Sequence, residues 1–198
     1  DVLIIGCGIA GATAALRLSE DRQREVTLVT RAADPPESNT RYAQGGIVTL
    51  GHGDRPELLV KDILAAGAGL TLPLAAHIVA EEGPTLIERV LARTAGVQFD
   101  RSPDGTLSYG REAAHSCNRI LHVGDATGNA IIQALIRVLL ERPNVHIVTR
   151  ATAVDLITFP HHATNPLQVY KPITCHGAYV IDQTQRTVDR YLAGTTIL

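Results

Sequence analysis

The sequence contains no methionine and no tryptophan, and only 4% of its 198 residues are aromatic. So few rings cannot build a stacking surface for nucleic-acid bases. Acidic and basic side chains nearly balance, with a formal net charge of −2, so the composition does not indicate an anionic partner. No apolar run approaches the ~18 residues that a membrane-spanning helix needs. We therefore expect a protein that binds neither nucleic acid nor membrane.

Cysteine is also scarce. Cys7, Cys117 and Cys175 lie far apart, which matches neither a zinc site nor a disulfide framework. The adjacent His161 and His162 have no third ligand at metal spacing along the sequence, so no metal site is predicted. No charged and then apolar export signal is visible, and we expect a cytoplasmic protein. The composition, 45% hydrophobic and 19% charged, is ordinary for a chain that can bury a core.

The opening residues carry the pattern of a dinucleotide-binding turn. An apolar stretch over 2–5 leads directly into a G-x-G-x-x-G motif, and an alanine-rich helix is predicted over 11–21. In this pattern the first glycine turns the chain, the second admits a pyrophosphate, and the third lets helix and strand pack closely. The predicted cofactor contacts are Gly6, Cys7 (a small filler), Gly8, Ile9, Ala10 and Gly11.

The second predicted strand, 26–30, does not settle which dinucleotide binds. It ends in Thr30-Arg31, where an acid usually accepts hydrogen bonds from the ribose. One interpretation is NADP with Arg31 on its 2′-phosphate, and the other is FAD in a family that dispenses with the acid. On either interpretation Thr30 and Arg31 are predicted cofactor contacts.

The segment 38–47, Ser-Asn-Thr-Arg-Tyr-Ala-Gln-Gly-Gly-Ile, distinguishes these interpretations by resemblance. Together with the opening motif it resembles the flavoprotein family of succinate dehydrogenase, fumarate reductase and L-aspartate oxidase. In that family the loop runs along the pyrophosphate and the flavin. The Tyr-Ala-Gln-Gly-Gly run is most similar to the L-aspartate oxidase branch. The resemblance continues through 66–69, 96–100, 111–116, 119–122 and 125–128.

The resemblance implies FAD bound without a covalent link. Asn39 stands where succinate dehydrogenase and fumarate reductase carry the histidine that bonds to the flavin. By the same resemblance, Ala153 lies near the adenine. The further FAD contacts implied are Asn39, Thr40, Arg41, Tyr42, Ala43, Gln44, Gly45, Gly46 and Ala153.

The implied activity is the oxidation of L-aspartate to iminoaspartate with oxygen or fumarate as acceptor, the first step of NAD biosynthesis from aspartate. Hand-over of iminoaspartate to quinolinate synthase is an implied partnership. Glu112 falls on the family's Arg-Glu-Gly-Gly-His-Ser motif and is the candidate that binds the substrate ammonium. Ala113-Ala114 replaces Gly-Gly in this motif, and His115 and His122 are expected to play supporting roles.

Two alternatives remain open at this point. One is a soluble flavoprotein of the fumarate reductase or succinate dehydrogenase type, and the other is a non-catalytic module that binds NADP. By resemblance the catalytic residues are expected beyond Leu198, so residues 1–198 alone are expected to be inactive.

The predicted fold class is α/β: a Rossmann-like FAD-binding domain with a parallel sheet, a helical insertion and a β-hairpin or meander near the C-terminus. Residues 1–198 are expected to be its N-terminal part, with the remainder, a substrate-capping domain and a C-terminal helical domain outside the sequence. Charged side chains on the predicted helices are interpreted as solvated. Helices are predicted over 55–66, 74–82, 85–92 and 129–141, with a break at Gly83-Pro84 and a cap from Asp125 or Thr127. Strands are predicted over 96–100, 145–149, 153–158 and 195–198, with a hairpin of 177–182 and 187–192 and an exposed insertion over 159–175.

Overall fold

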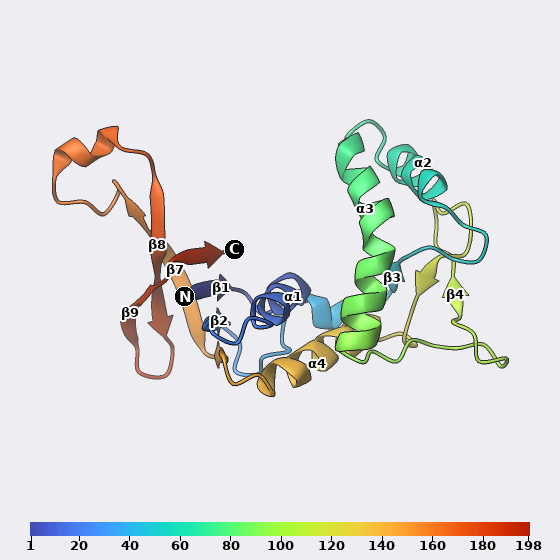
Figure 1. Ribbon diagram of the computed structural model, residues 1–198, viewed down its shortest axis with the longest axis horizontal. Helices are drawn as coiled ribbons and strands as arrows, with labels where there is room; N and C mark the ends of the chain where they lie inside the picture. Colours follow the sequence, from blue (N-terminus) through green and yellow to red (C-terminus); the bar gives the residue numbers. More distant parts are fainter. The chain divides into compact units, whose positions relative to one another are not determined.

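The computed structural model describes residues 1–198, which form two compact units (Figure 1). Unit 1 comprises residues 1–40 and 135–198, and unit 2 comprises residues 41–134. The helix α4, Thr127–Leu140, carries the chain from unit 2 back into unit 1. None of the helices has both the length and the apolar content that crossing a bilayer demands.

Unit 1 is built on a four-stranded parallel sheet with the order β10-β1-β2-β6. Read from β6 and numbered along the chain, this order is 3-2-1-4, which is the order of dinucleotide-binding folds. Its strands are mostly apolar, as expected for a parallel sheet that is covered on both faces. They are β1 (Val2–Ile5), β2 (Val26–Val29), β6 (Val145–Val148) and β10 (Thr195–Ile197). The predicted parallel sheet is therefore confirmed, with β10 as a half-exposed strand at its edge.

The helix α1 (Ile9–Leu18) follows β1 directly. It begins two residues before the predicted start at Gly11, because the glycine motif itself forms its first turn. Ala12, Ala15 and Leu16 are buried along one face. Small alanine side chains let this face lie close to the sheet.

A three-stranded antiparallel meander completes unit 1, in the order β7-β8-β9. Its strands are β7 (Ala151–Phe159), β8 (Thr174–Asp182) and β9 (Thr187–Leu192). Ala178 and Val180 of β8 join Leu3 of β1 in one buried cluster, which attaches the meander to the parallel sheet. The predicted hairpin is confirmed. The predicted exposed insertion between β7 and β8 holds a 3₁₀ turn, η3 (Pro166–Tyr170), with no buried residue.

Unit 2 combines helices with a small antiparallel sheet of order β3-β5-β4. The 3₁₀ turn η1 (Asn39–Tyr42) lies where the chain enters this unit. A cluster of Leu59, Val60, Ala76 and Ala80 packs α2 against α3. The remaining elements are β3 (Ile47–Val48), α2 (Pro56–Ala66), α3 (Pro73–Leu86), the π-helix η2 (Ile87–Thr94), β4 (Tyr109–Gly110) and β5 (Ile120–Leu121).

The predicted helix break at Gly83-Pro84 is wrong. The helix α3 runs through both residues and continues into the π-helix η2. Pro84 has no N–H and cannot complete the helical hydrogen bond to the residue four positions earlier. The helix nevertheless continues past Pro84, and in η2 the hydrogen bonds span five positions, as in the bond from Ala95 N to Val90 O at 2.9 Å.

The predicted strand over 96–100 in unit 2 is wrong, and so is Thr127, one of the two predicted caps of α4. Residues 96–100 form no strand, although Val97 and Phe99 are buried, because this segment has no ladder of backbone partners. Thr127 does not cap α4: it is the first helical residue, and its hydroxyl accepts a hydrogen bond from Val123 N at 3.0 Å. The alternation of apolar residues fits the burial of Val97 and Phe99, while strand pairing depended on partners far along the chain.

Candidate functional site

The glycine motif forms the turn that the sequence predicts. Gly6 has φ +109°, in the region that glycine favours, and its N–H donates to Val29 O at 2.9 Å. A Cβ on Gly11 would overlap the Gly6 carbonyl oxygen, so only glycine lets α1 start this close to β1. Gly8 provides no side-chain cap, and the first turn of α1 carries no acid. The positive end of the helix is thus available to an anion.

The segment 38–47, called here the amide-rich loop, contacts this turn through Thr40. The Thr40 Oγ1 accepts a hydrogen bond from Ile9 N at 3.0 Å. A Cβ built on Gly8 would lie 3.3 Å from the same oxygen, so a side chain at this position would crowd the Thr40 hydroxyl. Two segments that are 31 residues apart therefore meet at the place where a pyrophosphate is predicted.

The end of β2 holds the two residues predicted for the ribose. Thr30 is buried, and its Oγ1 accepts a hydrogen bond from Ala32 N at 3.4 Å. Arg31 is exposed, and its carbonyl accepts from Gln183 Nε2 at 3.1 Å. Ala153 is half-buried and packs against the apolar cluster at β1 and β2. These residues all belong to unit 1, together with the glycine motif.

Cys7 behaves as the predicted filler. It is 3% exposed, and burial raises the pKa of its thiol to about 12. The thiol is therefore neutral at physiological pH, and a neutral thiol is a poor nucleophile.

In unit 2 the rest of the amide-rich loop lies beside Glu112. Residues 42–46 are exposed, and Gln44 and Gly45 line a cavity of about 370 Å³ together with Glu112 and His122. A Cβ on Gly45 would overlap the Glu112 Oε1, so the glycine is what lets the carboxylate lie over the loop backbone. Of the residues that the resemblance proposed, Gln44, Gly45 and Glu112 are thus brought together.

His122 reaches the same cavity and is held by a carboxylate. Its Nδ1 pairs with Asp100 Oδ2 at 2.9 Å, and Gly124 N donates to the same oxygen at 2.8 Å. The hydrogen bond from the Gly124 N–H, followed by the one with His122, holds the pKa of Asp100 below its usual range. The Asp100 carboxylate thus fixes the orientation of the His122 ring at the cavity, which is compatible with the supporting role expected of it.

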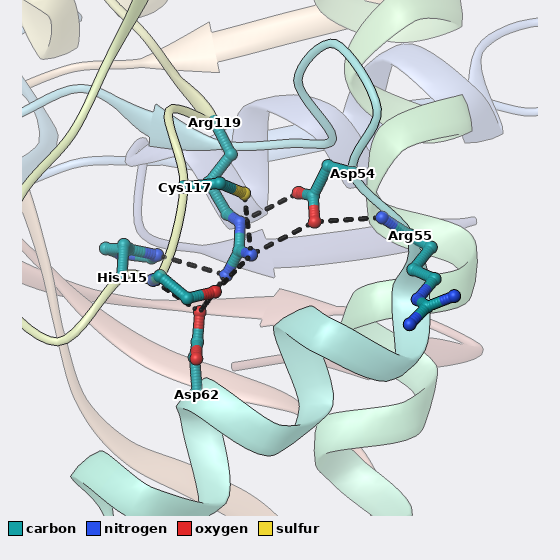
Figure 2. Close-up of polar contacts among 7 residues, drawn as sticks. Asp54, Arg55, Asp62, His115, Cys117 and Arg119 are labelled. Carbon is teal, nitrogen blue, oxygen red and sulfur yellow. Dashed lines mark hydrogen bonds and ion pairs between the residues drawn. The ribbon is translucent and has the colours of Figure 1, made fainter.

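A buried charged cluster surrounds Arg119 (Figure 2). The Arg119 side chain is fully buried. It donates from Nε and Nη2 to the two oxygens of Asp54, at 2.8 and 3.0 Å, and from Nη1 to Asp62 Oδ2 at 2.6 Å. A two-pronged guanidinium–carboxylate pair of this kind is among the stronger charged contacts in proteins.

The carboxylates of this cluster are held in their charged form. Burial acts to raise the pKa of Asp54, but hydrogen bonds from Arg119 and from the Arg55 amide bring it below its usual range. Burial also opposes the charge on Asp62, and the bonds from Ser116 and Arg119 outweigh it, so that pKa is lowered too.

Sequence reasoning missed Asp54 and Asp62. The interpretation of helix charges as solvated is wrong for Asp62, whose side chain is 13% exposed. The available signal was Arg119 directly before the apolar Ile120 and Leu121, since a buried guanidinium requires carboxylate partners. Sequence spacing could not identify those partners, because they lie 65 and 57 residues away.

The structure also brings a third potential ligand to His161 and His162. Asp155 of β7 places a carboxylate oxygen within 4.8 Å of a nitrogen of each ring, which the sequence spacing did not indicate. However, Thr158 N donates to His162 Nδ1, which leaves the ring proton on Nε2, 3.6 Å from Asp155 Oδ2. This arrangement is that of a histidine–carboxylate pair.

Comparison with known proteins assigns the family. The family described as FAD binding domain matches residues 1–198, and the chain belongs to it. L-aspartate oxidases from Halobacterium salinarum and Nicotiana tabacum (2-b, chloroplastic) are 40% and 36% identical over 100% of this chain. The match covers 36% and 29% of those proteins, so the chain spans about a third of their length. The fold is that of E. coli quinol fumarate reductase FrdA, with TM-score 0.86 at 21% identity, over 99% of this chain and 31% of that chain.

The residues of this chain fit FAD, the cofactor of the family. The start of α1 has no side-chain cap from Gly8 and no acid in its first turn, which suits a pyrophosphate. Gly8 keeps a side chain out of the turn, and Gly11 lets α1 start close to β1. Thr40 lies at the same turn. When bound, FAD supplies the oxidant that accepts a hydride, while the protein supplies orientation and electrostatics.

Proposed function

We propose that the full-length protein oxidises L-aspartate to iminoaspartate, with oxygen or fumarate returning the flavin to its oxidised state. The observation that carries the proposal is Glu112, whose carboxylate lies over Gly45 in the cavity that Gln44 and His122 also line. The similarity to named L-aspartate oxidases over the whole chain supports it. The proposed role is the first step of NAD biosynthesis from aspartate, in the cytoplasm, with iminoaspartate passing to quinolinate synthase.

Glu112 would select the substrate by charge. Its exposed carboxylate attracts the ammonium group of L-aspartate and repels a dicarboxylate that lacks one, such as succinate. The ammonium must then lose a proton before a hydride can leave Cα, because the nitrogen lone pair forms the new C=N bond. Arg111 lines the same cavity and offers a cation to a substrate carboxylate.

We further propose that FAD is held without a covalent bond. Asn39 and Thr40 have no imidazole to bond with the flavin, and Thr40 instead contributes its hydroxyl to the Ile9 N–H. Precipitating the purified protein with acid should leave the yellow colour in solution. Flavin retained in the pellet would contradict this proposal.

The activity is tested with the full-length protein and the variant Glu112→Gln. Wild type should form hydrogen peroxide with L-aspartate and not with succinate, while Glu112→Gln should raise the KM for L-aspartate about tenfold or more, since it removes a charge-assisted contact. Oxidation of succinate by wild type would favour the fumarate reductase type. A colourless protein that binds NADP would favour the nucleotide-binding module.

A further inference from the structure

Few hydrogen bonds hold the turn that carries Glu112. The residues 111–114 are exposed, and the turn closes on itself through His115 N, which donates to Glu112 O at 3.2 Å. At the base of the loop, Arg119 N donates to Gly110 O at 3.0 Å. The side chain of an exposed loop can place a charge accurately only if the loop is fixed elsewhere.

The fixing contact is Asp62 on α2. One oxygen of Asp62, Oδ2, accepts from both the N–H and the Oγ of Ser116, each at 2.8 Å. Arg119 donates a hydrogen bond to the same oxygen and another to Asp54 (Figure 2). The contact joins residues that are 54 positions apart, and it ties the loop to a helix four residues after Glu112.

The contact would hold the loop in one position. Arg119 and Asp54 are buried and fully engaged, so Asp62 presents a fixed acceptor to Ser116 rather than a mobile one. A displacement of about 1 Å in a positioning group can cost up to ~100-fold in rate. Loss of the Ser116 bonds would let Glu112 move away from Gly45.

We propose that Asp62, held by Arg119, is a positioning residue that acts through Ser116 to keep Glu112 over Gly45, and that this contact sets the preference for an amino dicarboxylate over a plain dicarboxylate. The inference rests on the proposed function, because it requires Glu112 to bind the substrate ammonium. It assigns the preference to a contact between two residues 54 positions apart as well as to Glu112 itself.

The test compares Ser116→Ala and Asp62→Asn with a matched control in the full-length enzyme. The control is Asp104→Asn, because Asp104 also accepts from the N–H and hydroxyl of one residue, Thr106, at 2.9 and 2.7 Å, but in an exposed turn. Ser116→Ala should raise the KM for L-aspartate about tenfold, as loss of a charge-assisted bond would. The inhibition constant for succinate, which has no ammonium, should change less than about twofold, as should all constants of Asp104→Asn.

A double-mutant cycle separates positioning from stability. If Ser116 acts through Glu112, adding Ser116→Ala to Glu112→Gln should raise the KM for L-aspartate no further. An equal tenfold rise in both backgrounds would overturn the inference, as would an unchanged KM in Ser116→Ala alone. An unchanged KM in Glu112→Gln would instead contradict the proposed function, so the two failures are distinguishable. Flavin absorbance of each variant confirms that the cofactor site is intact, and Ser116→Ala serves if Asp62→Asn does not fold.

Discussion

The two units of the chain are organised in different ways. Unit 1 is held by apolar strands and backbone hydrogen bonds, and its buried cluster of Leu3, Val29 and Val180 contains no charge. Unit 2 has an apolar cluster between α2 and α3, but it also buries an arginine with two carboxylates. An apolar sheet tolerates small changes in packing, whereas a buried charge depends on each of its partners.

The two units also differ in the kind of group that is proposed to contact the ligands. In unit 1 the predicted cofactor contacts are largely backbone groups, so glycines and strand ends suffice to form them. In unit 2 the proposed substrate contact is a carboxylate on an exposed loop, and holding it requires side-chain bonds. Substitutions in the two units should therefore damage the protein for different reasons.

The largest effect is expected from Arg119→Ala. Removing the guanidinium leaves Asp54 and Asp62 buried without their cation, which should cost about 3–5 kcal/mol of unfolding free energy. Arg119→Lys keeps the positive charge but loses the planar set of N–H donors, and it should lower the unfolding free energy by less than Arg119→Ala does. The matched control is Arg93→Ala, which removes an exposed pair with Glu88 and should cost less than about 1 kcal/mol. Urea unfolding measures all three, and equal losses for Arg119→Ala and Arg93→Ala would show that burying the charged cluster makes unit 2 no more dependent on its partners than an exposed pair does.

Gly11→Ala should be the most damaging small change in unit 1. The added methyl overlaps the Gly6 carbonyl oxygen, which is backbone and cannot turn aside, so about 3 kcal/mol of overpacking is expected. Displacement of α1 should also abolish FAD binding, measured as loss of flavin absorbance. The control is Arg17→Ala on the exposed face of the same helix. A yellow Gly11→Ala protein of normal stability would show that the close approach is not required.

Acid should weaken unit 2 through its cluster. The folded-state pKa values of Asp54 and Asp62 lie below the ordinary value of about 3.9. Their stabilisation is therefore complete above the unfolded-state pKa and is lost as the pH falls through the folded-state values. The protection of the α2 amides against hydrogen exchange should fall below about pH 4. Asp62→Asn should show a shallower dependence on pH, and an identical profile in both proteins would count against this assignment.

The smallest effect is a gain from Ala114→Gly. Ala114 has φ +67° in the Glu112 turn, a conformation that costs a residue with a Cβ about 1 kcal/mol. Glycine relieves this strain but frees the unfolded chain, so the net gain should be at most about 1 kcal/mol. Thermal unfolding measures it. Ala113→Gly, at a neighbouring position without positive φ, should instead give no gain, and a loss in Ala114→Gly would show that the turn relaxes without glycine.

The sequence predicted unit 1 more completely than unit 2. Strand 2–5, the glycine turn and the helix after it follow from one another over a few residues, so local pattern predicts them. The hairpin near the C-terminus was predicted for the same reason. In unit 2 the continuous helix through Pro84 and the absent strand at 96–100 depended on neighbours that local pattern does not contain.

By itself, the sequence determined the strand–glycine–helix turn, the apolar strands of the parallel sheet and the placement of Glu112 in a motif. Local geometry is sufficient there, because a turn without Cβ atoms and an apolar strand allow few alternatives. Only the tertiary structure decided that Thr40 lies on the glycine turn, and that Asp54 and Asp62 surround Arg119. A buried charge requires partners wherever the chain can bring them, and the fold alone determines which residues those are.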